Sequence, residues 1–86
     1  MHTVEILDQA ITAAQLLGVK IRQEWLGGDG GGGCEIRGQK WVFLDLTQSP
    51  AEHLAQVVDT IRGEPGLSHL DLPPELTRML EVRRAA

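Results

Sequence analysis

The sequence has 86 residues, of which 42% are hydrophobic and 23% are charged, and its formal net charge is -4. This composition predicts one globular domain spanning residues 1–86 and excludes a disordered tail. Acidic residues outnumber basic ones by 12 to 8 without a basic stripe, so we expect no nucleic-acid partner and no binding to a membrane surface. The single cysteine excludes an intramolecular disulfide and a multi-cysteine metal site within one chain.

The first predicted element is an amphipathic helix over residues 4–17, because its polar residues gather on one side of a helical wheel. Thr3 is the expected N-cap, and Gly18 is the expected residue that ends the helix. A strand over residues 19–26 follows, in which β-branched residues alternate with charged ones. The segment Gly27–Gly33, which contains six glycines, then ends this strand.

A β-hairpin comes next, formed by residues 34–37 and 40–45. The intervening Gly38-Gln39 predicts a type II′ turn. The resulting register places Ile36 opposite Trp41 and Cys34 opposite Phe43, so that these four side chains share one face. We therefore expect Cys34 to be a small buried hydrophobic residue.

The other face of the last strand is also apolar, because it carries Val42, Leu44 and Leu46. A strand that is apolar on both sides is either central in its sheet or covered by a partner chain. We therefore predict Val42, Leu44 and Leu46 as interface residues of a homodimer.

Two further helices are predicted. The run Ser49-Pro50-Ala51-Glu52 indicates a capping box with proline at the first helical position, and this helix continues to about residue 62. Its expected apolar stripe comprises Ala51, Leu54, Ala55, Val58 and Ile61, with Val57 at the edge and His53 toward the polar face. Pro73 and Pro74 begin a short last helix with Leu76, Met79 and Leu80 as its apolar stripe. The fold class is α+β, in the order α-β-β-β-α-α, with a small three-stranded antiparallel sheet packed against the helices.

The glycine-rich segment has two interpretations. It is a flexible connection between strands, or a ligand-binding loop whose amides and thiol would come from Gly30, Gly31, Gly32, Gly33 and Cys34. No Walker lysine or hydroxyl residue follows the glycines, and the next element is a strand rather than a helix. The sequence therefore lacks both common phosphate-binding patterns.

A reactive thiol at Cys34 would need a neighbouring imidazole or cation to lower its pKa. The histidines are His2, His53 and His69, and their spacing connects none of them to Cys34. The sequence predicts no catalytic residue, no metal ligand and no cofactor.

The stretch over residues 19–45, with its glycine run, Cys34 and the hairpin, resembles a family of small uncharacterised bacterial proteins of about this length. The resemblance extends to the segment Leu72-Pro73-Pro74-Glu75-Leu76. It implies a cytoplasmic bacterial protein and supplies no catalytic residue. Residues 40–45 and 49–61 also resemble the strand and helix of zincin-like metallopeptidases, but the HExxH motif is missing, which implies an inactive scaffold.

These observations predict a non-enzymatic protein that associates with itself or with another protein, most simply as a homodimer. The alternative is a ligand-binding or thiol-dependent protein that uses the Gly27–Gly33 loop and Cys34. The absence of a signal peptide and of a long apolar segment predicts a cytoplasmic location without a membrane partner.

Overall fold

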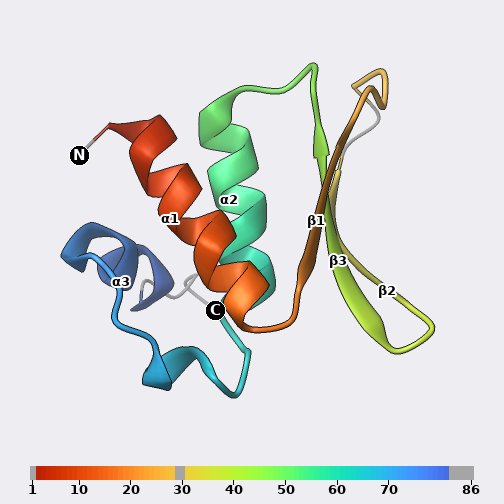
Figure 1. The fold of residues 1–86 in the computed structure, drawn as a ribbon. Coiled ribbons are helices and arrows are strands. Elements are labelled where there is room, and N and C mark those ends of the chain that lie inside the picture. Colours follow the sequence, from red (N-terminus) through yellow and green to blue (C-terminus); the bar gives the residue numbers. More distant parts are fainter. Residues whose placement is uncertain (1, 29–30, 82–86) are drawn as a thin grey trace, which may run out of the picture.

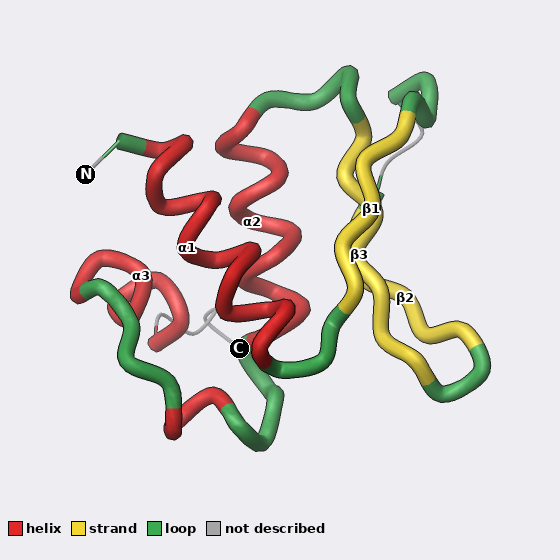
Figure 2. Tube along the Cα trace, in the orientation of Figure 1, coloured by secondary structure: helices red, strands yellow, loops and turns green. Residues whose placement is uncertain are grey.

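The computed structural model describes residues 2–28 and 31–81, which form an α+β fold (Figures 1 and 2). Its elements in chain order are α1 (Thr3–Leu16), β1 (Lys20–Glu24), β2 (Gly32–Ile36), β3 (Gln39–Asp45), α2 (Pro50–Ile61), the short 3-10 helix η1 (Leu67–His69) and α3 (Pro74–Glu81). The order of the α-helices and strands agrees with the one predicted from the sequence, whereas η1 lies in a segment predicted as a linker.

The three strands form a mixed sheet in the order β1-β3-β2. β3 is the central strand, parallel to β1 and antiparallel to β2. The prediction of an antiparallel sheet is therefore wrong for the pair β1 and β3. β3 pairs with both neighbours, and its two apolar faces suit this central position.

The hairpin is present, but its turn lies one residue earlier than predicted. Arg37 and Gly38 both have positive φ, at 52° and 77°, as a type I′ turn requires. Ile36 consequently pairs with Gln39 rather than with Trp41, and Trp41 pairs with Cys34. The register differs from the prediction by two residues, which is one period of side-chain alternation, so the faces are unchanged.

The helices cover the opposite face of the sheet from the one expected. α1 and α2 lie side by side on the face that carries Val42 and Leu44, and both side chains are 0% exposed (Figure 1). The chain itself therefore buries these residues, which corrects their assignment to a partner interface. Leu46, at 39% exposure, follows β3 and is the one predicted interface residue at the surface.

The alternation of β1 explains this orientation. Its register with β3 places Ile21 beside Val42, on the face toward the helices. Lys20 pairs with Trp41 on the other face, and there the ammonium group stays in solvent. The charged residues of β1 thus determine which face of the sheet is left open.

The predicted capping box of α2 is confirmed. The Ser49 hydroxyl accepts a hydrogen bond from the Glu52 amide, and the Glu52 side chain accepts one from the Ser49 amide. At α1 the N-cap is His2 without a side-chain hydrogen bond, so the prediction of Thr3 is wrong by one residue. Gly18 has φ +85°, which agrees with its predicted role at the helix end.

The buried face of α2 is rotated relative to the prediction. Ala51 and Ala55 are exposed, whereas His53 and Val57 are buried. The rotation buries the larger side chains, which remove more apolar area from water than alanine does.

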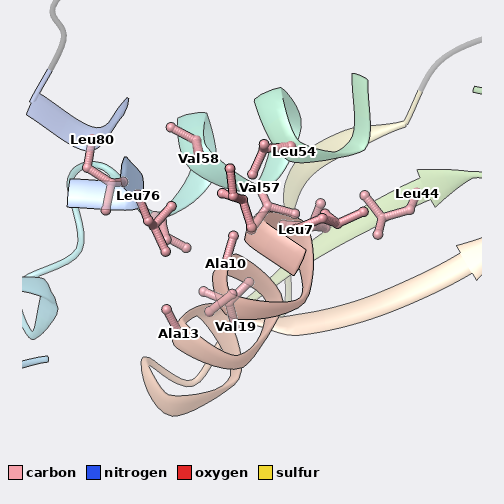
Figure 3. Packing of buried hydrophobic residues seen from close by; sticks show 14 residues of the cluster. Leu7, Ala10, Ala13, Val19, Leu44, Leu54, Val57, Val58, Leu76 and Leu80 are labelled. Atoms are coloured by element: carbon pink, nitrogen blue, oxygen red, sulfur yellow. The ribbon is translucent and has the colours of Figure 1, made fainter. Parts of the chain in front are cut away.

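The core lies between the sheet, the α1–α2 pair and α3, as Figure 3 shows. Ala10, Ala13 and Ala14 of α1 are almost fully buried, and their small size lets α2 approach closely. On the side of these helices away from the sheet, Leu76 and Leu80 anchor α3 (Figures 1 and 3). They belong to the stripe predicted for this helix.

Candidate functional site

The described glycines that follow β1 or begin β2 have specific structural roles. Gly27, Gly28 and Gly32 have φ values of +67°, +82° and +114°, which side-chain-bearing residues rarely adopt. A Cβ atom on Gly31 would overlap the backbone oxygen of Phe43, and one on Gly33 would lie 2.6 Å from Thr60 Oγ1. Backbone conformation and close packing therefore account for glycine at these five positions.

Asp45, at the end of β3, holds the beginning of this segment in place. Its fully buried carboxylate accepts hydrogen bonds from the backbone amides of Leu26, at 3.2 Å, and Gly28, at 2.9 Å. The same carboxylate accepts hydrogen bonds from the Thr47 amide, at 2.9 Å, and the Thr47 hydroxyl, at 2.8 Å. Asp45 was not among the residues predicted for a site, although an aspartate that ends an apolar strand and precedes a turn is typical of such side-chain to backbone bonds.

These bonds lower the pKa of Asp45 below its ordinary 3.8. The largest cause is the Thr47 backbone amide, and the Thr47 hydroxyl and the amides of Leu26 and Gly28 act in the same direction. Burial acts in the opposite direction. The net shift keeps the carboxylate ionised, as an acceptor of several N–H groups requires.

His53, which follows the first turn of α2, also contacts Asp45. Its Nε2 atom lies 2.6 Å from the backbone oxygen of Asp45, and its side chain is buried. His53 therefore has a structural hydrogen bond, and it joins the start of α2 to the end of β3.

A cavity of about 430 Å³ lies beside β2, on the side of the sheet covered by α2. It is lined by residues 32–35, Lys40, Gln56, Asp59 and Thr60. The Nε2 atom of Gln56 donates to Gln48, whereas its buried Oε1 atom has no hydrogen-bond partner among the described residues. The cavity brings three predicted ligand-binding residues together, namely Gly32, Gly33 and Cys34.

Gly31, another candidate ligand-binding residue, is not part of this cavity lining. Gly31 packs against the backbone of β3, and Gly30 lies outside the described residues. Cys34 borders the cavity but pairs with Trp41, so its side chain belongs to the face away from α2. It is exposed, which corrects its interpretation as a buried hydrophobe.

The face of the sheet away from the helices carries two aromatic residues of β3. The rings of Trp41 and Phe43 are stacked with centroids 5.8 Å apart, and both residues are half-buried. The Lys20 ammonium lies 5.3 Å from the centroid of the Trp41 ring, a cation–π distance. Ile36 of β2 lies on the same face and is 47% exposed.

The two edges of the sheet differ in charge. β1 forms one edge and carries Lys20, Arg22 and Glu24, of which the last two form an ion pair. β2 forms the other edge with the sequence Gly-Gly-Cys-Glu-Ile, which has one charged residue. We call the face with Trp41 and Phe43, together with the free edge of β2, the open side of the sheet.

Within residues 2–28 and 31–81, no group of three or more histidine, cysteine, aspartate or glutamate side chains is placed to hold a metal ion. In the same part of the chain, no helix has the length and apolar character needed to cross a membrane. Comparison with protein-family models, with curated proteins and with solved structures gives no match.

Proposed function

We propose that the protein is a non-enzymatic, self-associating domain that forms a homodimer through the open side of its sheet. The observation that carries this proposal is the face of the sheet that no described helix covers, on which the stacked Trp41 and Phe43 lie near the exposed Ile36. Aromatic residues clustered with an aliphatic neighbour are typical of the centre of protein interfaces.

The size of the chain supports the same proposal. A domain of 86 residues has a small core, and its two long helices cover only one face of the sheet. Each square ångström of apolar surface that association removes from water contributes about 25 cal/mol. A second copy that joins the open side thus removes part of its apolar surface, including the exposed Ile36, from water.

Ile36→Asp tests this proposal, because it introduces a charge on the exposed part of the open side. We expect the variant to be monomeric by light scattering at concentrations at which the unmodified chain is dimeric. Val4→Asp is the matched control: Val4 is 55% exposed on α1, far from the open side, so this variant should stay dimeric. If both variants retain the mass of the unmodified chain, the open side is not the interface.

The cavity beside β2 favours a second candidate, a ligand-binding or thiol-dependent protein. This candidate rests on the cavity lining, which includes Gly32, Gly33 and Cys34. It predicts that Cys34 reacts with a chromogenic disulfide reagent at pH 6 to 7 faster than free cysteine, whose pKa is about 8.5. A rate equal to that of free cysteine would remove the thiol-dependent version.

We also propose a cytoplasmic location in a bacterium. The resemblance to small bacterial proteins and the single cysteine support it. Fractionation of bacterial cells that express the full chain tests this location, and recovery from the periplasm would overturn it.

A further inference from the structure

We propose that two copies of the chain pair through β2, antiparallel to each other and centred on Cys34, to form one continuous six-stranded sheet. This inference rests on the proposed function and specifies its geometry. β2 is an edge strand, and in the described part of the chain no segment other than β3 pairs with it.

The edges of the sheet differ in how well they accept another strand. Charged side chains on an edge strand disfavour pairing with a second sheet, and β1 carries Lys20, Arg22 and Glu24. β2 has Glu35 as its single charged residue, and Gly32 and Gly33 present no side chain to an approaching strand. The free edge of β2 is therefore the more accessible of the two.

The turn of the hairpin determines which backbone groups of β2 face outward. Ile36 and Gln39 flank the two-residue turn, so they form a hydrogen-bonded pair of the antiparallel ladder. Hydrogen-bonded and non-hydrogen-bonded pairs alternate along the strands. Gly33 and Glu35 consequently occupy non-hydrogen-bonded positions, and their N–H and C=O groups point to the outer edge.

One register uses these groups and the full length of the strand. Gly33 of one copy pairs with Glu35 of the second copy, which also places Gly32 opposite Ile36 and Cys34 opposite Cys34. All five residues of β2 are then paired. A shift of two residues in one direction places Glu35 opposite Glu35, where like charges repel, and a shift in the other direction leaves part of β2 unpaired.

This register also extends the apolar contacts of the open side. Gly32 pairs with Phe43 within the chain, and a Cβ atom at Gly32 would meet no atom within 4 Å, so there is space above the backbone there. The second copy's Ile36, opposite Gly32, fills this space and approaches Phe43. The exposed Ile36 side chain would thus be covered in the dimer.

Cys34 provides a direct test, because it would face its counterpart at a non-hydrogen-bonded position. Cα atoms at such positions lie about 4.5 Å apart, within the range that a disulfide spans. Diamide takes two electrons and two protons from the two thiols, is reduced to the hydrazine, and leaves one disulfide bond between the copies. We expect rapid conversion of the unmodified chain to a covalent dimer.

A chain with the thiol moved by one position serves as the control for random collision. In Cys34→Ser/Glu35→Cys the new thiol is exposed but lies opposite Gly33 of the second copy. We expect its cross-linking by diamide to be slower than that of Cys34 by at least about tenfold, because only Cys34 benefits from enforced proximity. Equal rates would overturn the proposed register.

Glu35→Pro tests the pairing without chemistry at the thiol. Proline removes an amide that the ladder with β3 does not use, but its ring blocks an added strand. We expect Glu35→Pro to be a monomer with an unchanged circular dichroism spectrum, and Glu35→Ala to remain a dimer. If the proline variant does not fold, the two cross-linking rates still decide the question.

The outcomes separate the two proposals. A dimer in which Cys34 cross-links no faster than the control, and which persists in Glu35→Pro, overturns pairing through β2 and leaves self-association intact. A chain that is monomeric at every concentration overturns both.

Discussion

The carboxylate of Asp45 accepts a hydrogen bond at 2.9 Å from the backbone amide of Gly28, a residue 17 positions earlier in the chain. This bond joins the end of the central strand to the start of the glycine-rich segment. Asp45→Asn would give up one of the two acceptor oxygens and place an NH₂ group against amide donors. We expect a lower midpoint of urea unfolding, whereas Asp71→Asn, at an exposed position, should change stability by less than about 0.5 kcal/mol.

The same carboxylate predicts how stability depends on pH. Because the pKa of Asp45 in the folded chain lies below 3.8, the folded state favours the ionised form more than the unfolded state does. This contribution is fully present above the unfolded pKa and is lost as the pH falls through the lower folded pKa. Urea unfolding between pH 6 and pH 3 should therefore show a decline at the acid end that is smaller in Asp45→Asn.

The packing of the glycines predicts a graded series of alanine variants. Gly31→Ala meets the backbone of Phe43, which cannot move aside, and should be the most destabilising. Gly33→Ala meets Thr60 Oγ1 at 2.6 Å and should cost about 1–3 kcal/mol, as overpacking does. Gly63→Ala meets nothing within 4 Å and serves as the neutral control.

Combining Gly33→Ala with Thr60→Ala separates overpacking from other effects. The second change removes the two closest atoms of Thr60 and leaves its Cβ atom at 3.5 Å, an ordinary contact. Urea unfolding of the four chains of this double-mutant cycle should show that the double variant loses less stability than the sum of the single variants. Simple additivity would mean that Thr60 is not what requires glycine at position 33.

The orientation of the sheet predicts different costs for two leucines. Leu44→Ala removes a 0% exposed side chain from the core and should lower the free energy of unfolding by about 2–5 kcal/mol. Leu46, at 39% exposure, should tolerate alanine with a loss below about 1 kcal/mol. Similar losses in denaturant titrations of the two variants would contradict the burial of Leu44 by the chain's own helices.

Local sequence signals predicted most of the secondary structure. The box formed by Ser49 and Glu52 located the start of α2, and Gly18 located the end of α1, because both signals act within one turn of helix. The turn at Arg37-Gly38 was misplaced by one residue. A positive φ at a non-glycine residue such as Arg37 is uncommon, so the sequence favoured a turn with glycine first.

The sheet order and its covered face depend on contacts between distant segments, and neither was predicted correctly. β1 pairs with β3 although β2 lies between them in the sequence, and no local pattern encodes that contact. The signal that could have identified the open face is the alternation Lys20-Ile21-Arg22, because a face shared with two cations cannot be the core. The predicted register placed Trp41 and Phe43 on one face with Cys34 and Ile36, and that face was expected to be the buried one.

The central claim is that the open side of the sheet brings two copies of the chain together. Sedimentation equilibrium of the unmodified full chain over a wide range of concentrations tests it most directly. We predict a mass of twice the 9.4 kDa of one chain at high concentration, which falls toward the single-chain mass on dilution. A mass equal to that of one chain at every concentration would contradict the claim.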